Sequence, residues 1–274
     1  MTNLVDIINL LRRFIKNKAI RIAVASRIIL FITFAVTLVL MAPDQLTKTD
    51  LPFVSMFTKW DSAWYQRIAI HGYPFKDAMW DGSPPLQNWA FFPLYPALMR
   101  LFASFFWFQP YTNLDQATMI SGFIISNICF LLSALFLYKL SNKLFNNTNI
   151  AQLSVVFFSF FISSNIFSMV YSESLFMFLT IAAFYFLENN KLLFAVPLAV
   201  LASFTRSNGF LVFVPFAISG IQALISNKIT IGYKQRIEKG MLETKKALKL
   251  FGSSIIIASP YFLWNLLGNF VIPS

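Results

Sequence analysis

The chain places an aspartate, an arginine and its only histidine within eleven residues, in the stretch TKWDSAWYQRIAIHGYP at positions 58–74. The ionisable side chains are Asp61, Arg67 and His71, and the aromatic side chains among them are Trp60, Trp64, Tyr65 and Tyr73. A carboxylate can take a proton from an attacking hydroxyl, a guanidinium can hold a leaving phosphate, and aromatic faces can hold sugar or apolar surfaces. This combination suits transfer of a glycosyl group from a lipid-linked donor.

Two further polar clusters follow apolar runs, YSES at 171–174 and TRSNG at 205–209. An ionisable group at membrane depth costs a few kcal/mol unless it is paired or hydrated, so such residues usually mark a site. If the three clusters lie on one side of a membrane, they predict a polar cavity at its outer boundary.

The composition is that of an integral membrane protein. Of the 274 residues, 57% are hydrophobic and 12% are charged, and the mean hydropathy is +0.65. The single cysteine, Cys129, lies inside an apolar run, which excludes a disulfide framework and a cysteine metal site. The net charge of +11 would suggest nucleic acid in a soluble protein. In a membrane protein it reflects sidedness instead, so we expect no nucleic-acid partner.

The apolar runs define the elements that must position these clusters. They fall near 23–42, 89–108, 119–138, 151–170, 174–187, 192–205, 209–225 and 250–267. If all eight crossed the bilayer, the basic segment 226–249 would lie opposite the basic N-terminus, against the positive-inside rule. The conflict disappears if 89–108, which Pro93, Pro96 and Arg100 interrupt, is an interfacial helix on the outer face. The sequence therefore predicts an all-α, polytopic fold with about seven transmembrane helices.

This topology separates the charges by sign. The inner side holds fifteen of the 22 Lys and Arg residues. The outer side collects seven acids: Asp44, Asp50, Asp61, Asp77, Asp81, Asp115 and Glu173. The runs 174–187 and 192–205 are short for a full crossing, so we expect them to be tilted, broken or lining a cavity. The first run has no small-residue cleavage site after it and is predicted to be a retained span.

Each polar cluster also has a purely structural interpretation. Asp61 could cap a helix that begins at Ser62, and a lone histidine is more often a hydrogen-bonded structural residue than a ligand. Glu173 and Arg206 could pair as buried counterions, and the aromatic residues suit any membrane-interface belt. The common side of the three clusters favours the functional interpretation.

Several reaction classes are excluded by what the sequence lacks. It has no glycine-rich phosphate loop, no plausible Ser-His-Asp arrangement and no pair of histidines at metal spacing. The outer carboxylates could hold a divalent cation, but no ligand spacing requires one, so we expect neither a metal nor a cofactor.

The ordered set KWDSAWYQRIAIHGYP, NWAFFPLYP, SNIFSMVYSESLFMFLTIAAFYFLE and LASFTRSNGF resembles the PIG-V family of mannosyltransferases, membrane enzymes of the GT-C class. The likeness runs from about residue 26 to residue 215. It implies a polyprenyl (dolichyl) phosphate mannose donor on the non-cytosolic side and a glycolipid acceptor. Eukaryotic members add the second, α-1,6-linked mannose to the glycosylphosphatidylinositol precursor in the endoplasmic reticulum. Prokaryotic relatives mannosylate other lipid or envelope acceptors, at the plasma membrane.

The resemblance also implies roles for individual residues. Asp61 would be the catalytic aspartate of the first outer loop, acting as general base or orienting the acceptor hydroxyl in an inverting transfer. Arg206 and Arg67 are expected toward the donor phosphate, and Glu173 and Asn208 toward sugar hydroxyls or the structure of the cavity. The full set of expected substrate-binding residues is Trp60, Arg67, His71, Tyr73, Glu173, Arg206 and Asn208.

We therefore expect one transmembrane glycosyltransferase domain over residues 1–274, with an outer catalytic loop at 43–118 and a basic inner loop at 226–249. The inner loop should face membrane lipids with anionic head groups. Family members generally continue beyond the last segment, so a shortened member or one that needs a partner subunit is expected. The alternatives are a GT-C enzyme for another sugar or envelope acceptor, a transporter, and a non-catalytic scaffold subunit.

Overall fold

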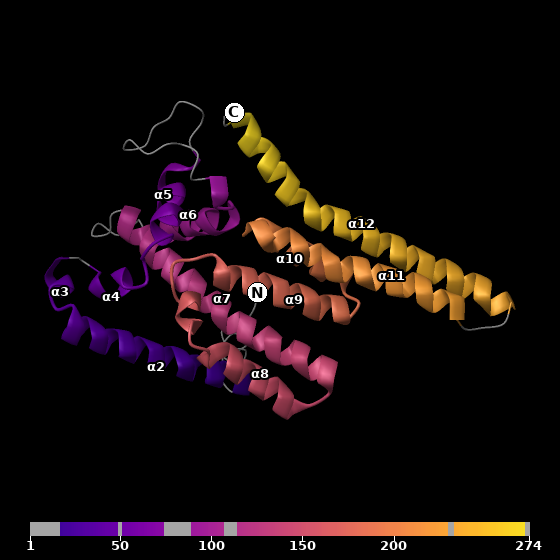
Figure 1. The fold of residues 1–274 in the computed structure, drawn as a ribbon, viewed down its shortest axis with the longest axis horizontal. Coiled ribbons are helices and arrows are strands. Elements are labelled where there is room, and N and C mark those ends of the chain that lie inside the picture. Colours follow the sequence, from indigo (N-terminus) through magenta and orange to yellow (C-terminus); the bar gives the residue numbers. More distant parts are fainter. Residues whose placement is uncertain (1–16, 49–50, 74–88, 107–113, 230–232, 272–274) are drawn as a thin grey trace, which may run out of the picture. The chain divides into compact units, whose positions relative to one another are not determined.

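In the computed structural model, residues 17–48, 51–73, 89–106, 114–229 and 233–271 are described, and all regular structure among them is helical. The chain divides into two compact units, one of Met1–Tyr73 with Pro93–Ala182 and one of Pro74–Phe92 with Ala183–Ser274. Figure 1 shows the course of the helices. The expected acids Asp50, Asp77 and Asp81 and the basic residues Arg12, Arg13 and Lys16 lie outside the described residues.

In the first unit the α-helices are α2 (Lys18–Met41), α3 (Gln45–Lys48), α4 (Pro52–Ser55), α5 (Ser62–His71), α6 (Leu94–Phe106), α7 (Leu114–Phe145) and α8 (Thr148–Phe160). A 3₁₀ turn, η2 (Ser164–Phe167), follows α8, and α9 (Glu173–Glu188) runs from the first unit into the second. The second unit contains α10 (Leu192–Ser203), the 3₁₀ helix η3 (Ser207–Val212), α11 (Phe213–Ile229) and α12 (Tyr233–Val271).

Four described helical segments are long and apolar enough to cross a bilayer: Lys18–Met41, Leu114–Phe145, Ser207–Leu224 and Lys245–Leu267. Two further apolar helices, α8 and α10, have 13 and 12 residues and are shorter than a span requires. An all-α polytopic membrane fold is therefore confirmed, and the number of seven spans stays a prediction.

Part of the run 89–108 forms a short helix, α6, and its interfacial position on the outer face stays a prediction. Helix α6 has 13 residues, about 20 Å at the α-helical rise, which is too short for the hydrocarbon core. Its fully buried residues Tyr95, Met99 and Ala103 recur every fourth position and give one inward face. Pro96 lies in the first turn, where its missing N–H costs no intrahelical bond.

The predicted span 151–170 is wrong over its second half. Helix α8 ends at Phe160, and only the short η2 is helical between there and α9. The segment after α8 reads FISSNIFS, whose Ser and Asn side chains compete with the helical backbone for hydrogen bonds. A continuous apolar run therefore hides a break that begins inside the predicted span.

In the second unit, α11 and α12 are long helices that pack side by side (Figure 1). Helix α12 begins at Tyr233, so most of the segment expected as an inner loop at 226–249 is helical and continues into the last apolar run. Hydropathy predicts where the apolar part of α12 starts, but the helix itself starts earlier, in the basic segment.

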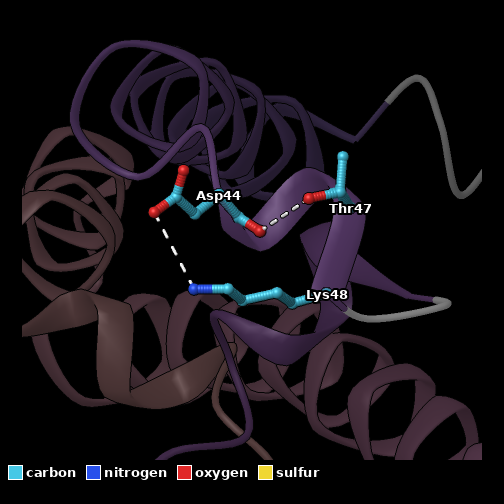
Figure 2. A network of polar contacts seen from close by, with 3 residues as sticks. All are labelled: Asp44, Thr47 and Lys48. Carbon is cyan, nitrogen blue, oxygen red and sulfur yellow. Dashed lines mark hydrogen bonds and ion pairs between the residues drawn. The ribbon is translucent and has the colours of Figure 1, made fainter.

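A short polar turn follows α2 on the expected outer side. The Asp44 carboxylate lies 3.8 Å from Lys48 Nζ, and Thr47 Oγ1 donates to the Asp44 carbonyl at 3.1 Å (Figure 2). Both charged side chains are largely exposed, so the ion pair contributes at most about 1 kcal/mol.

Candidate active site

Helix α5 carries the expected Asp61 cluster as one stripe. Its buried face consists of Ser62, Tyr65, Ile68 and Ala69. Trp64, Arg67 and His71 follow each other at spacings of three and four on the opposite, partly exposed face, in line with Asp61 at the helix start. The Arg67 guanidinium lies 5.2 Å from the centre of the Trp64 ring, a cation–π distance. Trp64 and Arg67 are therefore partly exposed and His71 is exposed, whereas Tyr65 is buried.

Asp61 occupies the N-cap position of α5, yet its side chain makes no capping hydrogen bond. The carboxylate is exposed. The structural interpretation of Asp61 as a helix cap required a bond from that carboxylate to the first turn. The position of Asp61 is that of a cap, but its side chain is not used as one.

The backbone around Asp61 is locally constrained. Trp60 has a φ of 49°, in the left-handed region that a bulky residue rarely adopts, and its indole is 78% exposed. Such conformations persist where the surrounding structure holds them, and they concentrate at functional sites. At the other end of α5, Gly72 has a φ of 82°, which a side chain would strain, so the HGY sequence ends the helix and turns the chain.

The YSES segment docks directly on this stretch. The backbone N–H of Val170 donates to the Phe57 carbonyl at 2.9 Å, and the Tyr171 hydroxyl donates to the Lys59 carbonyl at 3.0 Å. The hydroxyls of Tyr65 and Ser172 are 2.7 Å apart. Two hydrogen bonds thus join polar clusters that are more than 100 residues apart in sequence, and a third joins the residues that immediately precede them.

Both carboxylates of these clusters act on Tyr171. Burial raises the pKa of Tyr171, and the negative charges of Asp61 and Glu173 raise it further because they disfavour a phenolate. Glu173 lies in the first turn of α9, where the helix dipole favours a negative charge. Tyr171 is therefore kept as a protonated hydrogen-bond donor, and it donates to the Lys59 carbonyl.

Tyr95 of α6 supports the YSES segment through hydrogen bonds with α7. Its hydroxyl lies 2.8 Å from the Ser126 hydroxyl of α7 and donates to the Gly122 carbonyl at 3.1 Å, while Ser126 Oγ donates to the Tyr171 carbonyl at 3.2 Å. Gly122 permits this packing, since a Cβ there would meet Val170 Cγ1 at 2.4 Å. Helices α6 and α7 thus hold the backbone of Tyr171 in place.

Arg27 of α2 anchors the segment before YSES, and the sequence analysis missed it. Its guanidinium is buried and lies 4.1 Å from the centre of the Phe130 ring. Its hydrogen-bond acceptors are the carbonyls of Ser159 and Ser164 and the hydroxyls of Ser26, Ser164 and Ser168, at 2.8–3.3 Å. The last carbonyls of a helix have no intrahelical partner, and Arg27 supplies a donor for that of Ser159 at the end of α8 and for that of Ser164 in η2. The signal was present: an arginine inside the apolar run 23–42 needs a partner.

The third cluster, TRSNG, belongs to the second unit. Arg206 is half-buried at the N-cap position of η3, Asn208 is exposed, and Gly209 is buried against the end of α10. A Cβ on Gly209 would meet the Ala202 carbonyl oxygen at 2.3 Å, so this close turn requires glycine. Glu173 and Arg206 belong to different units, and their pairing and the roles of Arg206 and Asn208 stay predictions.

The structure brings Trp60, Asp61, Arg67, His71, Tyr73 and Glu173 into the first unit. Within the described ranges, no three His, Cys, Asp or Glu side chains gather into a group that could hold a metal ion. The arrangement offers an accessible carboxylate, a nearby cation and aromatic faces. That is sufficient for acid–base group transfer.

Comparison with known proteins agrees with this chemistry. Residues 41–268 match the family described as Mannosyltransferase (PIG-V). The chain is 27% identical over 224 residues to GPI mannosyltransferase 2 of Schizosaccharomyces pombe, covering 79% of this chain and 42% of that protein. It is 24% identical over 213 residues to GPI mannosyltransferase 2 of Cryptococcus neoformans, covering 76% of this chain and 45% of that protein. The chain thus spans less than half the length of these relatives. No solved structure matches it significantly.

Proposed function

The chain belongs to the PIG-V family of mannosyltransferases, and we propose that it transfers mannose from a polyprenyl-phosphate mannose donor to a lipid-linked acceptor. The observation that supports the proposal is the docking of YSES onto the Asp61 stretch through the Tyr65–Ser172 and Tyr171–Lys59 hydrogen bonds. The relatives are more than twice as long as the part of them that this chain matches. Their names make a glycosylphosphatidylinositol precursor the first acceptor to test.

In the proposed reaction Asp61 is the general base. An acceptor hydroxyl attacks the anomeric carbon of a β-linked mannosyl phosphate while the Asp61 carboxylate takes the hydroxyl proton. The bond from the anomeric carbon to the phosphate oxygen breaks, and its electron pair leaves with the polyprenyl phosphate. The configuration inverts. The carboxylate is suited to this role because it is exposed and makes no capping bond to α5.

The other residues bind and orient. Arg67, fixed over the Trp64 ring, would neutralise the charge that develops on the leaving phosphate. The exposed Trp60 indole offers a flat face for a sugar ring, and His71 and Tyr73 would border the acceptor. Glu173 would accept hydrogen bonds from sugar hydroxyls. Arg206 and Asn208 would serve the donor phosphate and sugar, respectively.

The chain is a multi-pass membrane protein. The expected sidedness puts the Asp61 stretch on the outer, non-cytosolic face, which is the endoplasmic reticulum lumen in a eukaryote and the outside of the plasma membrane in a prokaryote. A lipid-linked donor fits this location because it needs no soluble nucleotide sugar outside the cytosol.

Reconstitution tests the proposal. The purified chain in vesicles would receive radiolabelled polyprenyl-phosphate mannose and a panel of glycolipid acceptors. Transfer should fall by roughly a hundredfold or more in Asp61→Asn. The matched control is Asp44→Asn, since Asp44 is an exposed aspartate of the same expected outer region that makes only a surface ion pair. The Asp44→Asn variant should transfer mannose at the wild-type rate.

Two outcomes would overturn the proposal. Equal transfer by wild type and Asp61→Asn would show that Asp61 is not the general base. No transfer by the folded wild-type chain would overturn activity of the chain alone and favour a required partner subunit. Donors with other sugars, run in parallel, identify the transferred sugar.

A further inference from the structure

A pocket of about 760 Å³ lies within the second unit, and its lining includes none of the residues assigned to transfer. Four helices form it: the end of α9, the start of α10, α11 and α12. Its polar lining residues are Glu188, Asn190, Ser219, Gln222, Lys245, Lys246 and Lys249. Its apolar lining residues are Leu187, Leu192, Ala223 and Leu250.

The polar lining matches an oxygen-rich anion. Lys245, Lys246 and Lys249 face one carboxylate, Glu188, so the formal charge of the lining is positive. Lys245 and Lys249 are one helical turn apart on α12, and their ammonium groups can converge on one ligand. The amides of Asn190 and Gln222 supply neutral donors beside them. Ammonium and amide N–H groups around a concave site are a typical phosphate-binding arrangement.

The pocket lies at the membrane boundary. One candidate span ends at Leu224 and the next begins at Lys245, so both ends meet at the lining residues of α11 and α12. The positive-inside rule assigns this end to the inner side. The inner leaflet is where anionic phospholipids concentrate, and basic pockets between helices at this depth bind their head groups.

Exposed apolar side chains neighbour the lining residues of α11 and α12 in sequence. Ile221 and Leu224 of α11 and Leu248 of α12 are exposed large apolar side chains next to the lining residues in sequence. Acyl chains can lie along such a surface, whereas a soluble phosphate compound gains nothing from it. The joint presence of lysines and exposed apolar residues favours a lipid ligand.

We propose that this pocket binds the phosphate head group of an anionic phospholipid from the inner leaflet. The head group bridges the lysines of α12 to the α9–α10 turn and to α11. The site is separate from the transfer chemistry and does not depend on it.

The test measures thermal unfolding of the purified chain in phosphatidylcholine nanodiscs with increasing phosphatidylglycerol. Phosphatidylglycerol should raise the unfolding midpoint of wild type, and native mass spectrometry should show a retained phosphatidylglycerol molecule. Lys245→Gln with Lys249→Gln should weaken the apparent affinity by roughly tenfold or more, since each lysine near an anionic surface contributes about 1 kcal/mol. The control is Lys139→Gln with Lys143→Gln on α7, which removes equal charge from the expected inner side. This control should keep the wild-type rise of the unfolding midpoint with phosphatidylglycerol.

Three results would overturn the proposal: no shift with phosphatidylglycerol, an equal loss in the α7 control, or equal stabilisation by glycerol phosphate in pure phosphatidylcholine discs. The last result would assign the pocket to a soluble phosphate compound. If the double variant does not fold in phosphatidylcholine, Lys249→Gln alone replaces it, with Lys143→Gln as its control. Lys249→Gln should show a smaller rise of the unfolding midpoint with phosphatidylglycerol than wild type.

Discussion

The Tyr65 hydroxyl lies 2.7 Å from the Ser172 hydroxyl, and this bond closes a loop of 107 residues between α5 and the YSES segment. Ser172 is fully buried and Tyr65 is 5% exposed, so neither hydroxyl can exchange its partner for bulk water. The pair therefore couples the position of the Asp61 helix to that of Glu173, which follows Ser172 in the chain.

The Tyr65–Ser172 pair should be energetically coupled. Tyr65→Phe and Ser172→Ala should each lower the free energy of unfolding by about 1 kcal/mol, because each removes a buried hydrogen bond. The double variant should be less destabilised than the sum of the two single variants. Denaturation of all four proteins in one detergent gives the coupling energy. Strictly additive effects would show that the bond does not form.

The Asp61 side chain should be dispensable for stability. Asp61→Ala should change the free energy of unfolding by less than about 0.5 kcal/mol, because the carboxylate makes no capping bond, while transfer is lost. Asn147→Ala is the matched control at a true cap, since Asn147 Oδ1 accepts from the N–H groups of Asn149 and Ile150. That control should cost about 1 kcal/mol. Equal destabilisation of both variants would return Asp61 to a capping role.

Much of the candidate site could be predicted because its residues are conspicuous in an apolar chain. Charge sorting separated α6 from the spans, and the membrane side assigned to YSES and to Asp61 predicted their convergence. The partners that hold them were harder to predict. Tyr95 and Ser126 look like ordinary residues of an interfacial and a spanning helix until the tertiary structure joins their hydroxyls.

The break after Phe160 could not be predicted from hydropathy. The run 151–170 stays apolar through the break, and periodicity does not distinguish a buried irregular segment from a helix. The donors that stabilise the break come from Arg27, more than 130 residues away in sequence. Irregular backbone at membrane depth is tolerated only when protein groups satisfy it in this way.

Arg27 should therefore be essential for folding of the first unit. Arg27→Met should lower the free energy of unfolding by about 3 kcal/mol or more, because it removes donors from the carbonyls of the buried residues Ser159 and Ser164. Arg27→Lys keeps the charge but not the geometry of the guanidinium, so it should be intermediate. Arg21→Ala, at an exposed arginine of the same helix, should have little effect. Thermal unfolding in detergent measures all three, and a wild-type midpoint for Arg27→Met would contradict the anchoring role.

Tyr73 should make stability fall at alkaline pH. Burial, with a smaller contribution from Tyr65, raises the pKa of Tyr73 above its ordinary value of 10.0. Below pH 10.0 the tyrosine is protonated in both states, so its contribution is fully present; above that value the unfolded chain loses the proton first. Stability is then lost as the pH rises toward the folded pKa. Unfolding midpoints from about pH 8 to about pH 11 should fall more steeply for wild type than for Tyr73→Phe. Midpoints at neutral pH are the control for packing, and parallel slopes in the two proteins would refute the desolvation of the Tyr73 hydroxyl.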